Sequence, residues 1–342
     1  MDLHGLELDA GWLGFRPLFH ERRNIYFMDR RDKILAAEKV LPALMRSLEH
    51  CDLCHRKCGV NRLKGEKGHC ASGRETTVYR YAPHHGEEPP LSGRNGSGAI
   101  FFSRCNMNCV YCQNHRFSQT DRGKSMSSRE LSAIMLELQD MGCHNINLVS
   151  PTHFVPLIVE ALKYAFSDGL GLPVVYNTGG YDSEHVIRAL EGLVDIYLPD
   201  MRYSRDLMAE KYSVAPDYVS NNRDIVKEMY RQVGDLRVSD GIALKGLIIR
   251  LLLLPGGISG TEETLRFISG EIGKEVHLSV MSQYYPAYKA ASHEELAREI
   301  SDKDYSAVTE ELQKSGLSAG WVQPFEKNFD EQFAGENFSP SF

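Results

Sequence analysis

Short apolar runs alternate with amphipathic stretches through the middle of the chain. Apolar segments bounded by polar or glycine-bearing residues predict strands, and apolar residues three and four positions apart predict helices. Repeated strand–helix units imply parallel strands joined by right-handed crossovers. We therefore expect an α/β fold, a partial (βα)6 barrel similar to the TIM barrel. The predicted strands are 99–103, 145–149, 173–177, 194–199, 244–254 and 276–281, and the helices between them are 127–141, 153–167, 182–190, 221–233 and 261–272.

The segments on either side of this repeat follow different patterns. Residues 1–97 combine an arm rich in aromatic residues and arginines, a helix predicted over 32–50, and a segment with four cysteines. Residues 291–342 form a tail with amphipathic patterns at 294–300 and 305–315. We expect three parts: the amino-terminal extension at 1–97, the partial barrel at 98–290 and the helical tail at 291–342.

Three cysteines follow the first predicted strand. Cys105, Cys109 and Cys112 form a C-x3-C-x2-C run. Three thiolates on so short a loop can hold three corners of a cubane iron–sulfur cluster, which leaves one iron open to another ligand. The alternatives are unconnected thiols or a zinc site short of a ligand, and structural zinc sites have four.

A second cysteine group lies earlier in the chain. Cys51, Cys54, Cys58 and Cys70 supply four thiolates on a segment with a glycine-bearing turn, which is a complete tetrahedral set. Zinc fits this count, and so does an auxiliary iron–sulfur cluster; we favour zinc, and four unliganded thiols are the remaining alternative. The eighth cysteine, Cys143, stands alone and is expected to be a small buried apolar residue.

Composition and charge narrow the class of protein. The 342 residues are 42% hydrophobic and 25% charged, which is ordinary for a globular protein. A formal net charge of −7 disfavours nucleic acid as the main partner. No apolar run approaches the ~20 residues that cross a bilayer, and the first residues lack the pattern of a signal peptide. We expect a cytoplasmic protein with no membrane partner, in which cysteines bind metal rather than form disulfides.

Polar residues follow each predicted strand, where parallel barrels carry their chemistry. They comprise Ser150, Thr152, His153, Asn177, Asp200, Arg202, Arg250 and Gln283. An arginine in an apolar strand is costly to bury without a partner, so we expect Arg250 to meet a ligand. The string His84-His85-Gly86-Glu87-Glu88 could indicate a metal site. We favour a solvated or active-site-facing loop, because neighbouring residues on one loop seldom all point to one ion.

The cysteine spacing, with Tyr111 directly before the last cysteine, resembles the radical S-adenosylmethionine (SAM) superfamily. This resemblance implies a [4Fe-4S] cluster held by Cys105, Cys109 and Cys112, whose open iron binds the amino and carboxylate groups of SAM. An electron from the cluster, supplied by an external donor, then cleaves SAM and releases a 5′-deoxyadenosyl radical that removes hydrogen from a substrate. The cofactor carries the difficult chemistry, and the protein positions it.

The four-cysteine segment and the strand-end stretches at 148–153, 176–181 and 195–200 resemble an uncharacterised branch related to pyruvate formate-lyase activating enzymes. By this resemblance, Ser150, Thr152 and His153 replace the Gly-Gly-Glu that binds the SAM amino group. Arg202 replaces the lysine of an Asp-x-Lys motif that begins here at Asp200. The resemblance implies SAM contacts from Ser150, Thr152, His153, Asn177, Asp200, Arg202, Arg250 and Gln283. It assigns no catalytic residue.

Two classes of function remain open at this point. One is a radical SAM oxidoreductase or activase that removes hydrogen either from a backbone glycine of a partner enzyme or from a small molecule, peptide or protein side chain. The altered second-strand motif and the four-cysteine segment depart from the activases. The other class is a binding or regulatory module, organised by zinc, on a barrel that has lost catalysis. The substrate is not indicated by any residue pattern.

Overall fold

A computed structural model of the chain describes residues 13–14 and 29–326. Most of the predicted amino-terminal arm and the end of the carboxyl-terminal tail lie outside the described residues. No described helix has both the length and the apolar character needed to cross a membrane.

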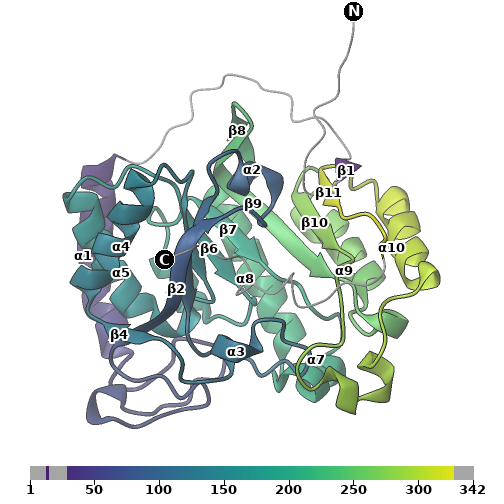
Figure 1. Ribbon diagram of the computed structural model, residues 1–342, viewed down its shortest axis with the longest axis horizontal. Coiled ribbons are helices and arrows are strands. Elements are labelled where there is room, and N and C mark those ends of the chain that lie inside the picture. Colours follow the sequence, from purple (N-terminus) through teal and green to yellow (C-terminus); the bar gives the residue numbers. More distant parts are fainter. Residues whose placement is uncertain (1–12, 15–28, 327–342) are drawn as a thin grey trace, which may run out of the picture.

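The fold is organised by an open, mostly parallel sheet with helices packed around it (Figure 1). The strand order is β1-β11-β10-β9-β7-β6-β5-β3-β2-β4, and in the described residues the two outer strands do not pair with each other. This confirms the predicted α/β fold with a partial barrel. The parallel strands are β3 (Ser97–Phe102), β5 (Ile146–Val149), β6 (Val174–Thr178), β7 (Ile196–Pro199), β9 (Ile242–Leu252), β10 (His277–Met281) and β11 (Gly320–Val322).

Antiparallel strands that the sequence pattern did not predict complete the sheet. β2 (Thr76–His84) pairs with β3 and with β4 (Lys124–Met126), and β1 (Leu13–Gly14) pairs with β11 at the other edge. β8 (Arg237–Ser239) forms a hairpin with β9. The direction of β2 matters for the site, because the chain must turn back after His84 to enter β3.

Helices cover the sheet (Figure 1). The longer ones are α1 (Arg30–Arg46), α4 (Ser128–Asp140), α5 (Val155–Ser167), α6 (Glu184–Ala189), α7 (Asp206–Ser213), α8 (Tyr218–Val233), α9 (Thr261–Phe267) and α10 (Asp302–Ser315). The short ones are α2 (Pro89–Ser92) and α3 (His115–Ser118). Single 3₁₀ turns lie at Arg62–Lys64, Thr152–Phe154, Pro255–Gly257, Ala290–Ser292 and Glu294–Leu296, and a π turn lies at Ile268–Ile272. The predicted helix at 294–300 is therefore wrong, since only one 3₁₀ turn forms there.

Local sequence explains where these elements begin and how they pack. Ser127 caps α4 through a reciprocal pair of hydrogen bonds with Glu130. β5, β6 and β7 are buried along their whole length, which is why they appear as apolar runs. α1 is tied to the sheet by a buried ion pair, in which Lys33 donates to Asp195 at 2.6 Å. A polar residue on α1 thus fixes the amino-terminal extension to the barrel.

Candidate functional site

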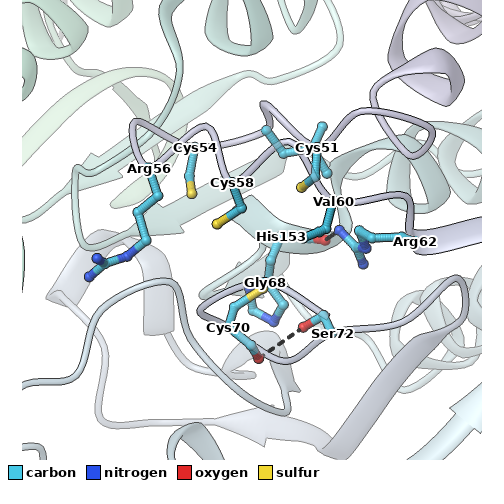
Figure 2. Close-up of a pocket in the computed structure, with 11 residues that line it drawn as sticks. Cys51, Cys54, Arg56, Cys58, Val60, Arg62, Gly68, Cys70, Ser72 and His153 are labelled. Carbon is cyan, nitrogen blue, oxygen red and sulfur yellow. Dashed lines mark hydrogen bonds between the residues drawn. The ribbon is translucent and has the colours of Figure 1, made fainter. Parts of the chain in front are cut away.

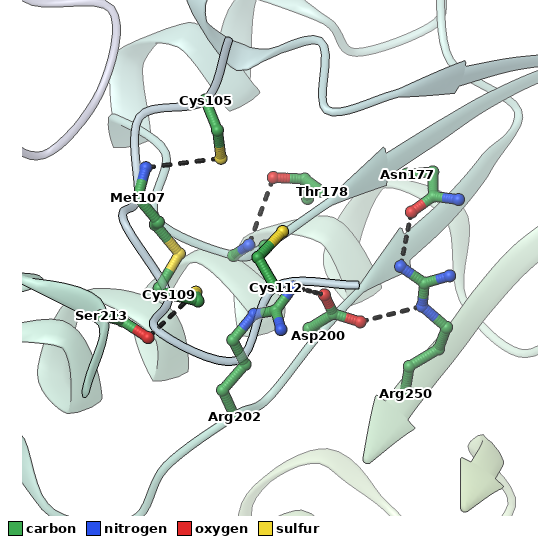
Figure 3. A network of polar contacts seen from close by, with 12 residues as sticks. Cys105, Met107, Cys109, Cys112, Asn177, Thr178, Asp200, Arg202, Ser213 and Arg250 are labelled. Carbon is green, nitrogen blue, oxygen red and sulfur yellow. Dashed lines mark hydrogen bonds and ion pairs between the residues drawn. The ribbon is translucent and has the colours of Figure 1, made fainter. Parts of the chain in front are cut away.

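The three cysteines predicted to hold a cluster share one loop at the carboxyl end of β3 (Figure 3). Burial raises the pKa of Cys105 to about 12 and that of Cys112 to about 11, and in both cases the next cause is the charge of Cys109. The three thiols therefore lie close enough to influence one another. A metal that binds here would displace their protons.

Hydrogen-bond donors and hydroxyls surround the three sulfur atoms. The backbone N–H of Met107 donates to the Cys105 sulfur at 3.4 Å, and the Ser213 hydroxyl donates to the Cys109 sulfur at 3.0 Å. The Cys112 sulfur lies 3.2 Å from a serine hydroxyl at the end of α3. Contacts of this kind around sulfur ligands set the reduction potential of an iron–sulfur cluster.

The aromatic residue before the last cysteine belongs to the same network. The Tyr111 hydroxyl lies 2.7 Å from that of Tyr203, which lies 2.7 Å from the Ser213 hydroxyl. Since Ser213 donates to Cys109, a chain of hydroxyls joins Tyr111 to a predicted cluster ligand. The sequence pattern located Tyr111 but gave no indication of its partners.

The amino-terminal extension contacts the loop that carries the three cysteines. Arg56 donates from Nε to the Asn106 carbonyl at 2.6 Å and from Nη2 to the Val214 carbonyl. Its guanidinium also lies 5.3 Å from the ring centroid of Tyr181, whose carbonyl accepts a hydrogen bond from the Asn106 side chain. The four-cysteine segment therefore contacts the backbone of the loop that carries Cys105.

A cavity of about 400 Å³ opens beside the loop, at the carboxyl ends of the parallel strands. It is bordered by Tyr111 and Cys112 on the loop. Six of the eight residues expected to contact SAM line it: Ser150, Asn177, Asp200, Arg202, Arg250 and Gln283. Ser150 has a φ of 58°, a left-handed conformation that non-glycine residues adopt mainly where the surrounding structure imposes it.

The charged residues of the cavity form one connected network (Figure 3). Arg250 donates from Nε to Asp200 at 2.9 Å and from Nη2 to Asn177 at 2.6 Å, and its Nη1 lies 3.7 Å from Glu87. Arg202 donates to the other carboxylate oxygen of Asp200. The arginine in the apolar strand is thus paired with protein carboxylates, as burial of a charge requires.

Arg202 connects this network to the cysteines. The charge of its guanidinium lowers the pKa of both Cys105 and Cys112, against the larger effect of burial. Its Nε is buried and has no hydrogen-bond partner among the described residues. The three cysteines, as thiolates, would bind the iron atoms of a cluster, and the neighbouring guanidinium would balance its negative charge. The unpaired Nε–H of that guanidinium could donate to the carboxylate of a ligand on the cluster.

The loop after β2 forms a further wall of the cavity. His84, His85, Glu87 and Glu88 line it, and all but His85 are buried. Burial lowers the pKa of His84 to about 4, so this imidazole is neutral near pH 7. Of the two interpretations of this string, the structure supports the loop that faces the active site. No described group of three or more His, Cys, Asp or Glu residues has the arrangement of a formed metal site.

Thr152 and His153, expected to contact SAM, do not line this cavity. The Thr152 hydroxyl donates to Asp182 at 2.7 Å, and His153 Nε2 lies 2.8 Å from the Ser103 carbonyl. The His153 carbonyl accepts a hydrogen bond from Arg62 at 2.6 Å. The chain enters a 3₁₀ turn at Thr152–Phe154, and both side chains there bond to protein groups. Contacts of Thr152 and His153 with SAM stay a prediction.

Sequence reasoning also missed the role of Asp182. This fully buried carboxylate accepts hydrogen bonds from the hydroxyls of Thr152, Tyr176 and Thr178, and these donors hold the turn after β6. Gly180 in the same turn has a φ of +72°, and a Cβ there would lie 2.6 Å from the Asp200 carbonyl. The polar run after β6 therefore shapes the wall that carries Asp200.

The four earlier cysteines line a separate, small cavity (Figure 2). Its volume is about 10 Å³, roughly the space of one water-sized sphere. Burial raises the pKa of Cys54 to about 12, and the charges of Cys70, Cys58 and Cys51 raise it further. Gly68 approaches Cys58 so closely that a Cβ would lie 2.9 Å from its sulfur. The four thiols share one space, but a bound metal there stays a prediction.

Comparisons with known proteins agree with this geometry. The chain matches the radical SAM superfamily over residues 99–207. It is 30% identical over 279 residues to the uncharacterized protein MJ0674 of Methanocaldococcus jannaschii, a match that covers 79% of this chain and 76% of that protein. The relation to pyruvate formate-lyase activating enzymes is not part of these matches and stays a prediction.

Solved structures give weaker likenesses. Methylornithine synthase is 12% identical with a TM-score of 0.46, over 93% of this chain and 90% of that one. A radical SAM methyltransferase from Sphaerobacter thermophilus is 12% identical with a TM-score of 0.44, over 87% and 94%. Because both TM-scores are below 0.5, we take no conclusion about chemistry from them. The cysteine loop, the cavity beside it and the sequence relatives together lead to one conclusion: this chain belongs to the radical SAM superfamily.

Proposed function

We propose that this protein binds a [4Fe-4S] cluster through Cys105, Cys109 and Cys112, and SAM in the adjoining cavity, to remove hydrogen from a substrate. When bound, the cluster and SAM together supply the electron and the 5′-deoxyadenosyl radical for this reaction. The observation that carries the proposal is that three thiols share one loop with Arg202 beside it, and that Cys112 and Arg202 border one polar cavity. A barrel that had lost catalysis would not be expected to keep this arrangement.

The residues of the cavity suggest how SAM would be held. Arg202 has a free Nε donor beside the cysteines, which suits the SAM carboxylate. Asp200 is fixed by two guanidiniums and can accept from ribose hydroxyls. Ser150 and Gln283 add polar groups at other strand ends. The protein thus positions SAM, and an external electron donor would have to reach the cluster.

We also propose that Cys51, Cys54, Cys58 and Cys70 hold a single zinc ion rather than an auxiliary cluster. The support is that all four thiols line one small cavity, which completes the tetrahedral ligand set of a structural zinc site. The contacts of Arg56 and Arg62 suggest what the ion does: it would keep this segment folded against the cluster loop and His153.

The test is an anaerobic assay of SAM cleavage. Protein reconstituted with iron and sulfide, given SAM and dithionite, should form 5′-deoxyadenosine, and Cys109→Ala should abolish it. Cys143→Ala is the matched control, because Cys143 is buried and lies outside both cysteine groups. The proposal fails if the parent protein forms no 5′-deoxyadenosine or if the Cys109 variant is equally active. A colourless protein that contains zinc alone would favour the binding module.

A further inference from the structure

Glu88 reaches the cavity from the end opposite to the cysteines. It occupies the N-cap position of α2, and the carbonyl of Leu91 in that helix accepts a hydrogen bond from Asn145, directly before β5. The cysteine loop instead follows the carboxyl end of β3. Figure 1 accordingly places α2 and α3 at opposite ends of the sheet. SAM bound to the cluster would occupy the cysteine end, which leaves the Glu88 end for a second reactant.

The Glu88 carboxylate is buried and incompletely satisfied. Its residue is only 2% exposed, and its Oε2 makes no hydrogen bond with any described residue. The buried hydroxyl of Ser279 on β10 interacts with Glu88 and lowers the pKa of that carboxyl. Buried carboxylates normally accept several hydrogen bonds or pair with a cation. Glu88 therefore has the properties of a ligand-binding group rather than of a structural one.

The charges of the cavity do not balance. Glu87, Glu88 and Asp200 contribute three carboxylates, whereas Arg202 and Arg250 contribute two guanidiniums. Both guanidiniums already bind Asp200, and Arg250 also donates to Asn177. Glu87 is held by the amide of Asn147 at 3.0 Å. Glu88 thus shares the Arg250 guanidinium with Asp200 and Glu87, and three carboxylates depend on that one cation.

Burial raises the pKa of Glu88 to about 7, against the attraction of Arg250, and the charge of Glu87 raises it further. A group that costs so much to ionise is stabilised strongly by an added positive charge. Phe101, Leu252 and Met281 add apolar surface to a wall that is otherwise largely polar. An aliphatic chain that ends in a cation matches both features.

We infer that the substrate carries a primary ammonium group on an aliphatic chain, and that Glu88 binds this ammonium with Glu87 behind it. The inference rests on the proposed function, because it assigns the cysteine end of the cavity to SAM. The ammonium group would lie at the end of the cavity next to α2. The aliphatic carbons would then extend past Phe101, Leu252 and Met281 toward the cluster. These carbons are the ones from which hydrogen would be removed.

The experiment is calorimetric titration of the reconstituted, SAM-loaded protein with n-butylammonium chloride and with n-butanol as the neutral probe of similar shape. We expect the ammonium to bind at least tenfold more tightly than the alcohol. Glu88→Gln should remove this preference, and Glu88→Asp should retain part of it. Glu310→Gln, which removes an exposed carboxylate on α10, should leave the preference unchanged. Melting temperatures of all variants verify folding.

SAM also carries positive charge, so its dissociation constant is measured for each variant. An unchanged value in Glu88→Gln supports the inference. A loss of SAM affinity equal to the loss of ammonium affinity overturns it, because Glu88 would then bind SAM. Equal binding of ammonium and alcohol to the parent protein also overturns it. Binding needs no turnover, so failure of the proposed function is recognised separately, by the absence of 5′-deoxyadenosine.

Discussion

Replacing Arg56 with alanine should loosen the cluster without touching a cluster ligand. The side chain donates to the Asn106 carbonyl, on the loop that carries Cys105, and to the Val214 carbonyl. A hydrogen bond with a charged partner contributes about 1.5–3 kcal/mol, and the partial exposure of Arg56 favours the lower end. If only the hydrogen bond to Asn106 stabilises the loop, its removal should destabilise the loop by about 1.5 kcal/mol. That corresponds to about tenfold weaker retention, since 1.4 kcal/mol is a factor of ten.

The assay is the rate at which a chelator removes iron from the reconstituted protein under nitrogen, followed by the loss of cluster absorbance. Arg56→Ala should lose iron about tenfold faster than the parent. Arg129→Ala is the control, because Arg129 also lies over a tyrosine ring but pairs with an exposed carboxylate on the surface. Equal rates in the parent and Arg56→Ala would refute the view that the amino-terminal extension holds the cluster loop.

Three further outcomes follow from the structure. Cys54→Ser should release the proposed zinc and lower the melting temperature while the iron content stays near that of the parent; equal loss of both metals would contradict two separate sites. Because the folded pKa of Glu88 is raised from 4.5 to about 7, its contribution to stability is present below pH 4.5 and is lost as the pH rises through 7. The free energy of unfolding should therefore fall relative to that of Glu88→Gln over this range, and parallel pH profiles would contradict the assignment. Lys33→Ala should cost about 3–5 kcal/mol in urea unfolding, because Asp195 stays buried without its cation. The exposed Lys314→Ala should cost less than about 1 kcal/mol, and similar losses would show that burial of the pair is unimportant.

The sequence predicted six of the seven parallel strands, because long buried strands appear as apolar runs, but it did not predict the short β11. It also located the cysteine loop, since the spacing of three thiols reflects a local constraint. It did not predict β2, whose residues alternate between buried and half-buried and include Pro83. The pairing of β2 with β3 is a tertiary property, and the position of Glu88 depends on it.

For the residues at the strand ends, too, the sequence predicted some features and not others. That Asp200 and Arg250 would lie near each other follows from the common direction of the strands, and the structure brings them to 2.9 Å. The directions of Thr152 and His153 depend on a single 3₁₀ turn and, for Thr152, on the buried acceptor Asp182. Alternation along a strand cannot be extended into such a turn. Side chains there could be named from the sequence, but not oriented.

The region that matches the superfamily, residues 99–207, carries all three cluster cysteines yet encloses no complete reaction chamber. Glu88 precedes that region, and Arg250 and Gln283 follow it. An expression fragment cut at those limits would therefore keep the cysteine motif and lose three residues of the cavity wall. The cavity of this protein is therefore a property of the whole sheet, and the motif region alone does not form it.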